Sequence, residues 1–117
     1  MRRPIRIIVC GGRDFADGSY VWNRLGEIDD SEGIAAVAHG GATGADSEAG
    51  AWARQSRKPV QVYQARWRQE GKAAGPLRNQ RMLDDFKPDA VVAFPGGRGT
   101  ADMVRRACDA GVRVIKA

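Results

Sequence analysis

Short apolar runs alternate with longer segments of helical periodicity along this chain. Residues 5–10, Ile-Arg-Ile-Ile-Val-Cys, are β-branched and almost wholly apolar, which is typical of a strand covered on both faces. Further strands are predicted over residues 34–38, 60–65, 90–94 and 112–115. The partial alternation of apolar and polar positions in 60–65 indicates an edge strand.

Four helices are predicted between these strands, each ended by glycine or proline. Ser19 is the expected N-cap of the first helix. Thr43 and Asp46 give the second helix a start that resembles a capping box. The first helix is indicated by the roughly helical spacing of Tyr20, Val21, Leu25 and Ile28. The expected apolar, inward-facing residues are Ala45, Ala49, Trp52 and Ala53 in the second helix, Leu77, Met82, Leu83 and Phe86 in the third, and Met103, Val104, Ala107 and Cys108 in the fourth.

This alternation predicts an α/β fold in three layers, a parallel five-stranded sheet with helices on both faces. The length of 117 residues predicts one domain, spanning 1–117. Because the glycine-rich turns follow strands, they should gather at the carboxyl edge of the sheet. If the first and fourth strands are neighbours, that edge holds the crevice in which such sheets bind ligands.

The stretch 91–103 is the strongest candidate for a binding site. A buried strand leads into Gly96, Gly97 and Gly99, and a helix is expected to begin at Thr100 or Ala101. Glycine lets a ligand approach the backbone, and the first N–H groups of a helix lack partners and carry the positive end of its dipole. The stretch therefore predicts a phosphate site; the alternative is a connection that merely turns a corner.

Charge adds a second feature. The net charge is +5, and the segment 64–81 carries Arg66, Arg68, Lys72, Arg78 and Arg81 against Glu70 alone. Such a cluster indicates an anionic ligand, a nucleic-acid patch or a solvated face. The segment around Trp67 is expected to be a loop.

Other function classes find little support. No apolar run is long enough to span a bilayer and no signal peptide is evident, so we expect a cytoplasmic protein without a membrane partner. With no CxxC and one histidine, no metal site is expected, and Cys10 and Cys108 are interpreted as buried thiols. Walker A and GxGxxG motifs are absent, which argues against NTP hydrolysis and dinucleotide redox chemistry, and no cofactor is expected.

Four motifs in order resemble the SLOG superfamily, which groups the DNA-processing protein A fold with the LOG phosphoribohydrolases, and within it the small YspA-like, YpsA-related branch. They are GGRDF at 11–15, HGGATGAD at 39–46, GPLRNQRM at 75–82 and PGGRGT at 95–100. The resemblance implies a Rossmann-like fold, for which we expect the strand order 3-2-1-4-5, and a nucleotide-type ligand. LOG relatives are commonly dimers, so a homodimer stays open.

LOG enzymes cleave the N-glycosidic bond of nucleoside 5′-monophosphates with a PGGxGTxxE motif and an upstream arginine. The resemblance implies that the PGG segment holds the phosphate and that Arg78, with Arg81 as a rival, matches the family's arginine. The position of the LOG glutamate is Met103 here. Since methionine cannot stabilise an oxocarbenium-like transition state or activate water, such hydrolysis requires Asp14, Asp46 or Asp102 as a substitute.

Candidate site residues follow from these motifs. Asp46, Asp102 and Arg78 are the candidate catalytic residues. Each acidic candidate has an alternative role as a helix-start or turn carboxylate, and His39 has one as a structural hydrogen-bonding group. The predicted ligand-binding residues are Gly11, Gly12, Arg13, Asp14, His39, Gly40, Gly41, Gly44, Asp46, Arg78, Asn79, Pro95, Gly96, Gly97, Arg98, Gly99 and Thr100.

Three functions remain in competition. The first is a module that binds a nucleotide or a nucleotide-derived phosphorylated ligand, as a sensor or sequestering domain. The second is an N-glycosidic hydrolase acting on nucleoside monophosphates. The third is a single-stranded nucleic-acid binder that uses the basic segment and Trp67.

Overall fold

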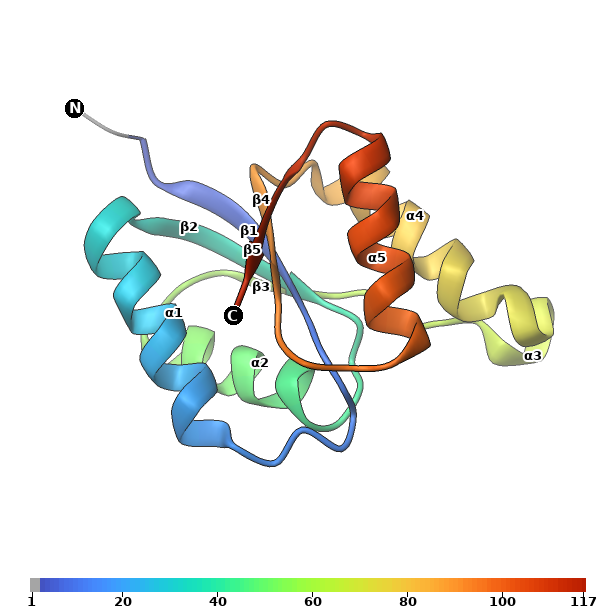
Figure 1. Cartoon of the computed structure of the whole chain (residues 1–117), viewed down its shortest axis with the longest axis horizontal. Coiled ribbons are helices and arrows are strands. Elements are labelled where there is room, and N and C mark those ends of the chain that lie inside the picture. Colours follow the sequence, from blue (N-terminus) through green and yellow to red (C-terminus); the bar gives the residue numbers. More distant parts are fainter. Residues whose placement is uncertain (1–2) are drawn as a thin grey trace.

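A computed structural model describes residues 3–117 as a five-stranded parallel sheet in the order β3-β2-β1-β4-β5 (Figure 1). This confirms the predicted α/β, Rossmann-like fold and its strand order. Parallel pairing of β1 with both β2 and β4 puts the first and fourth strands side by side at the centre. The strands are β1 (Ile5–Cys10), β2 (Ile34–His39), β3 (Val60–Val62), β4 (Ala90–Ala93) and β5 (Arg113–Lys116).

Helices cover both faces of the sheet. Helices α1 and α2 lie on one face, and α4 and α5 lie on the other (Figure 1). A short helix α3 and a 3-10 turn η1 precede α4. The bounds are α1 (Gly18–Glu32), α2 (Ala45–Gln55), α3 (Trp67–Glu70), η1 (Gly71–Ala73), α4 (Ala74–Phe86) and α5 (Arg98–Asp109).

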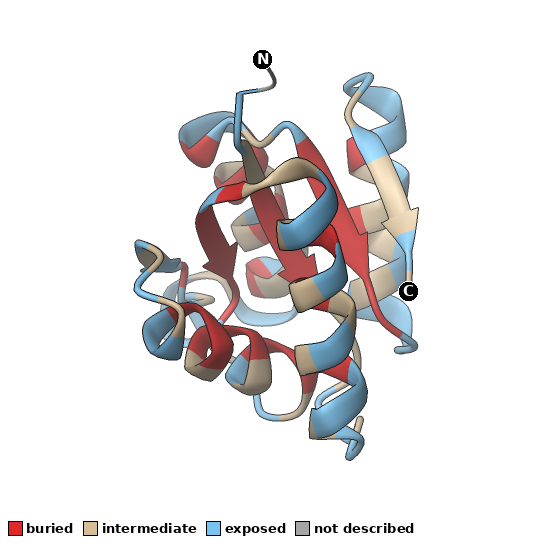
Figure 2. Cartoon of the chain, turned by 90° about the vertical axis from the view of Figure 1, so that its left-hand side faces the viewer, coloured by how far each residue is buried: buried red, intermediate tan, exposed pale blue. Residues whose placement is uncertain are grey.

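The alternation of side chains along β1 divides the core in two. Ile7 and Val9 pack in a cluster with residues of α1 and α2, whereas Ile8 packs with Met82 and Met103 of α4 and α5. All three β1 residues are fully buried. The central strands are therefore buried on both faces, while β5 at the edge is only partly covered (Figure 2).

Local predictions at two helix starts were wrong. Asp17 caps α1, and its carboxylate accepts the N–H of Tyr20 at 3.0 Å, while Ser19 lies inside the helix and donates to Asp17. Helix α2 has Gly44 as its N-cap, without a side-chain hydrogen bond. Thr43 donates to the Arg13 carbonyl instead, at 2.9 Å. In the first case Asp17 takes the capping position in place of Ser19, and in the second the Thr43 hydroxyl bonds a neighbouring loop in place of its own helix.

Four further predictions need correction. Helix α5 begins at Arg98, and not at Thr100 or Ala101. The segment around Trp67 is helical, in α3 and η1, and not a loop. Leu77 is exposed, unlike Met82, Leu83 and Phe86 on the inner side of α4. Cys108 is exposed as well. The buried residues of α5 are Met103 and Ala107. Within residues 3–117, no helix combines the length and the apolar character needed to cross a bilayer.

Candidate functional site

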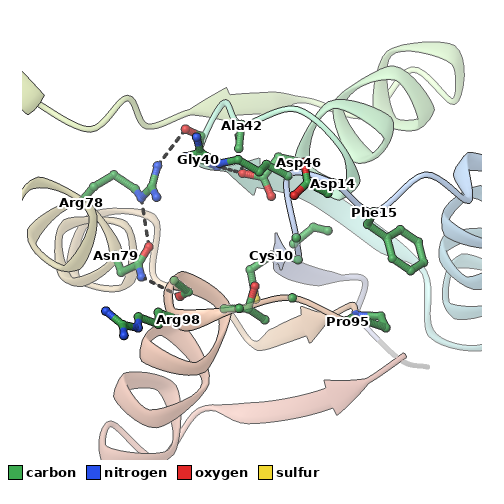
Figure 3. Close-up of a pocket in the computed structure, with 18 of the residues that line it drawn as sticks. Cys10, Asp14, Phe15, Gly40, Ala42, Asp46, Arg78, Asn79, Pro95 and Arg98 are labelled. Carbon is green, nitrogen blue, oxygen red and sulfur yellow. Dashed lines mark hydrogen bonds between the residues drawn. The ribbon is translucent and has the colours of Figure 1, made fainter.

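A cavity of about 600 Å³ opens at the carboxyl edge of the sheet (Figure 3). The turns after β1, β2 and β4 and the first turns of α4 form its walls. It lies next to the central β1–β4 pair, where strand order changes direction, as expected for parallel sheets. Its lining residues are Val9, Cys10, Gly11, Gly12, Arg13, Asp14, Phe15, Gly40, Ala42, Asp46, Arg78, Asn79, Met82, Pro95, Gly96, Gly97, Arg98, Gly99 and Thr100.

Glycines let the three turns pack against one another. The Gly12 N–H donates to the Pro95 carbonyl at 2.8 Å. A Cβ at residue 96 would stand 2.6 Å from the Gly12 nitrogen, and a Cβ at residue 44, where φ is +73°, would stand 2.7 Å from the Arg13 oxygen. Larger residues at these positions would push the turns apart, so glycine is needed to close the cavity's floor.

The N-terminus of α5 is uncapped at this cavity. Gly97 is its N-cap and offers no side chain, and the first backbone bond of the helix runs from Ala101 N–H to the Gly97 oxygen at 3.0 Å. The amides of Arg98, Gly99 and Thr100 have no hydrogen-bond partner among residues 3–117. These free donors lie at the positive end of the α5 dipole.

Several amides of the other glycine turns are already used, although those of Arg13 and Asp14 have no partner among residues 3–117. Gly40 and Ala42 donate to Asp46, Gly41 donates to His39, and Gly12 donates to Pro95. Among residues 3–117, the α5 start therefore supplies the longest run of free backbone donors in the cavity.

Asp46 is a buried carboxylate in the first turn of α2. Its side chain is held by hydrogen bonds from Gly40 N–H at 3.0 Å and Ala42 N–H at 3.3 Å, both to Oδ2. Burial raises its pKa to about 6, and the two backbone hydrogen bonds and the Arg78 charge oppose this only in part. Asp46 is thus a buried carboxyl with a raised pKa at the cavity wall, which is a common feature of functional sites.

Arg78 and Asn79 connect the cavity to α5. Arg78 Nη1 donates to the Gly40 carbonyl at 2.8 Å, and Arg78 Nε donates to Asn79 Oδ1 at 3.0 Å. Asn79 Nδ2 donates in turn to the Gly99 carbonyl at 3.2 Å and to Asp102 Oδ2 at 3.0 Å. Arg78 lines the cavity, and its Nη2 group has no hydrogen-bond partner within the described chain.

Asp102 is committed to a polar network and is absent from the cavity lining. It accepts from Asn79, Arg105 and Arg106. Burial raises the pKa of Asp102, but the hydrogen bonds from Asn79 and Arg106 and the arginine charges outweigh burial and leave that pKa below its usual value. Asp102 therefore serves as an ionised anchor for α5 and Asn79.

His39, Gly41 and Gly44, which were predicted to bind ligand, also lie outside the cavity lining. His39 Nδ1 accepts from Gly41 N–H at 3.0 Å, and Nε2 faces Gly50, where a Cβ would stand 2.8 Å away. Burial and the nearby charges of Arg54 and Arg78 lower the pKa of His39. A neutral, structural histidine follows from this environment.

The other predicted ligand-binding residues come together on one cavity from four segments of the chain. Five lining residues were not predicted: Val9, Cys10, Phe15, Ala42 and Met82. Cys10, at the end of β1, was interpreted only as a core residue, although its position directly before the Gly11–Gly12 turn was a usable signal. Burial and the nearby Asp46 charge raise the pKa of Cys10 to about 12, so its thiol stays protonated.

Met103 occupies the position of the LOG glutamate, and its side chain is buried in the apolar cluster beneath α4 and α5. Among residues 3–117, no group of three or more histidine, cysteine or acidic side chains is placed to hold a metal ion.

A second surface feature lies on α3, away from the cavity lining. Trp67 is 55% exposed, and its neighbours Arg66, Arg68 and Lys72 are exposed too. Arg81 is tied to the Gln64 carbonyl at 2.7 Å. The basic segment is thus divided between this surface and the cavity, because Arg78 belongs to the latter.

Comparisons with known proteins agree with this architecture. The profile of the YspA, cpYpsA-related SLOG family matches residues 5–69. The chain is also similar to the Gene 61 protein of Mycobacterium phage D29, with 38% identity over 118 aligned positions that cover 94% of each chain. No solved structure matches it. The family match includes β1, β2, β3, the turn that holds Gly12 and helix α2 with Asp46. On this basis the chain belongs to the YspA, cpYpsA-related SLOG family.

Proposed function

We propose that this protein binds a nucleotide or nucleotide-derived phosphorylated ligand in the cavity at the carboxyl edge of the sheet. The observation that carries the proposal is the uncapped start of α5, where the amides of Arg98, Gly99 and Thr100 have no partner within the described chain. A phosphate there would accept these hydrogen bonds and compensate the positive end of the helix dipole.

The charges around the cavity support an anionic group at this end. Arg13, Arg78 and Arg98 line the cavity, and the Nη2 group of Arg78 is free to donate. Asn79 fixes Arg78 relative to the α5 start by bonding both. An arginine held in this way forms charge-assisted hydrogen bonds to phosphate oxygens without ordering a flexible side chain first.

The size of the cavity and the family support a nucleotide as the bearer of the phosphate. About 600 Å³ lies within the usual range of small-molecule sites. Membership of the SLOG family supports a nucleotide-related ligand. Asp14 and Asp46 on the cavity wall would repel a second phosphate placed beside them, which favours a ligand whose negative charge is concentrated at one end.

Calorimetric titration tests this proposal. Wild-type protein is titrated with the four common nucleoside 5′-monophosphates and, separately, with the matching nucleosides. We expect at least one monophosphate to bind and its nucleoside to bind much more weakly. Equal binding of both members of every pair, or no binding of any monophosphate, would overturn the proposal.

Binding without hydrolysis is the form of the function that this site supports best. Met103 is buried in the core and Asp102 is committed to Asn79, Arg105 and Arg106, so the α5 motif supplies no carboxylate to the cavity. N-glycosidic cleavage needs such a group at the sugar, so a hydrolase would have to use Asp14 or Asp46, which line the cavity. Incubating the protein at high concentration with each monophosphate should release no free base that chromatography detects. Release of more free base than there is protein would instead establish a hydrolase.

The α3 surface favours single-stranded nucleic acid as a second candidate ligand. Exposed Trp67 can stack on a base while Arg66, Arg68 and Lys72 neutralise phosphates. Titration with a labelled oligonucleotide at two salt concentrations tests it, because binding of this kind weakens steeply with salt. A weak response that is the same at both concentrations would exclude it.

A further inference from the structure

Within residues 3–117, one oxygen of the Asp46 carboxylate has no hydrogen-bond partner. Asp46 is 6% exposed, and both of its hydrogen bonds, from Gly40 and Ala42, go to Oδ2. Oδ1 is not fully enclosed by the protein, and Asp46 lines the cavity. Oδ1 therefore faces the cavity space as an acceptor on a side chain that is more than nine-tenths buried (Figure 3).

The peptide groups of Gly40 hold Asp46 and Arg78 apart. The Gly40 N–H donates to Asp46 Oδ2 at 3.0 Å, and the Gly40 carbonyl accepts from Arg78 Nη1 at 2.8 Å. Within residues 3–117, Asp46 forms no ion pair within 4.0 Å. A Cβ at residue 40 would collide with the Arg78 guanidinium, so glycine is required for this arrangement. The protein thus keeps a buried negative charge without a cationic partner in contact.

We propose that Asp46 recognises the hydroxyl groups of the ligand's sugar, so that the protein selects ribose over 2′-deoxyribose. This inference rests on the proposed function and deepens it by naming the sugar. An ionised carboxylate only accepts hydrogen bonds, so the ligand group at Oδ1 must be a donor. The buried charge is costly in the empty cavity, and a donating hydroxyl lowers that cost on binding.

A sugar hydroxyl fits this position better than the other parts of a nucleotide. A phosphate has no proton to donate at neutral pH when fully ionised, and the negative charge of Asp46 repels it. A base needs a flat surface to stack on, whereas the immediate partners of Asp46 are the Gly40 and Ala42 peptides. The aromatic lining residue, Phe15, lies on the opposite side of the cavity from Arg78 (Figure 3).

Paired titrations test the inference. Each monophosphate that binds wild type is compared with its 2′-deoxy and 3′-deoxy counterparts. We expect loss of one or both hydroxyls to weaken binding about 10- to 100-fold, which is the usual effect of a hydrogen bond to a charged group. In Asp46→Asn the amide oxygen can still accept from Gly40 and Ala42, and the NH₂ group that then faces the ligand can donate only a neutral hydrogen bond to a hydroxyl oxygen, so the preference for ribose should shrink.

One control variant makes the outcome specific. Asp30→Asn removes the same charge on the exposed surface of α1 and should keep the wild-type ratio of ribose to deoxyribose affinity. A wild-type ratio near one, or a ratio unchanged in Asp46→Asn, would overturn the inference while leaving phosphate binding intact. If no monophosphate binds wild type at all, the proposed function fails and this inference fails with it.

Discussion

Arg78 Nε donates a hydrogen bond to the side-chain oxygen of its neighbour Asn79 at 3.0 Å. The other end of the Asn79 amide bonds the Gly99 carbonyl in the first turn of α5. One buried amide therefore fixes the guanidinium of α4 relative to the free backbone donors of α5. In this account the two halves of the phosphate site are positioned together.

Asn79→Ala should disturb both halves at once. The substitution leaves Arg78 Nε without its acceptor and removes a donor from Asp102 and Gly99. We expect a loss of about 1–3 kcal/mol in the free energy of unfolding and weaker monophosphate binding. Urea denaturation and calorimetry measure the two effects. Arg105→Ala, which removes a side chain that is 65% exposed, should cost less than about 1 kcal/mol and leave binding unchanged; equal effects of the two substitutions would contradict the role of Asn79.

Gly97→Asp should abolish phosphate binding without unfolding the protein. A Cβ at residue 97 meets nothing within 4 Å, so the substitution fits. The new carboxylate would cap the free amides of α5 and occupy the place of the phosphate, and it would stabilise the helix by about a few tenths of a kcal/mol. A thermal melt at or above that of wild type together with lost binding is expected. Retained affinity would move the anion site away from α5.

Arg78→Ala should weaken phosphorylated ligands more than free nucleosides. The guanidinium contributes a charge-assisted hydrogen bond to the phosphate, and its loss should cost about 10- to 100-fold in affinity. Calorimetry of a monophosphate and of its nucleoside with both proteins gives the comparison. Equal losses for both ligands would show that Arg78 does not pair with the phosphate.

Asp46→Asn should make the ligand-free protein more stable at neutral pH. The pKa of Asp46 is about 6 in the folded chain against an ordinary value of 3.8, so between these values the folded state binds more protons than the unfolded state. Stability contributed by this group therefore falls as pH rises from about 4 to 6. Asparagine does not ionise, so the variant should gain about 3 kcal/mol at pH 8 and almost nothing near pH 4. Urea titrations at both pH values measure this; a gain that is the same at both would contradict it.

The fold follows from the sequence because buried parallel strands are continuous apolar runs, and the helices between them have clear apolar faces. The two errors at helix starts arose where polar side chains compete for the helix end or form tertiary contacts. Asp17 competes with Ser19 for the start of α1, and Thr43 bonds the carbonyl of Arg13, which is distant in the chain. Sequence spacing carries no information on a distant contact such as the bond from Thr43 to Arg13.

The candidate site was predicted as a set of turns, but the state of each backbone amide was not. The stretch 91–103 was predicted as the strongest candidate, but the sequence did not show that Gly40, Gly41 and Ala42 use their amides in internal bonds while those at the start of α5 are free. Asp46 and Asp102 looked alike as first-turn acids. Only packing distinguishes the buried Asp46, with one open oxygen, from Asp102, which is bonded to Asn79 and two arginines.

The most direct test of the phosphate site follows the backbone amides themselves. Two-dimensional ¹H–¹⁵N NMR spectra of the protein are recorded during titration with the monophosphate that binds best. The account predicts that the Arg98, Gly99 and Thr100 amides move strongly downfield as they donate to the phosphate, while amides of β5 and of the C-terminal half of α1 stay in place. Binding that leaves those three amides unshifted would contradict it.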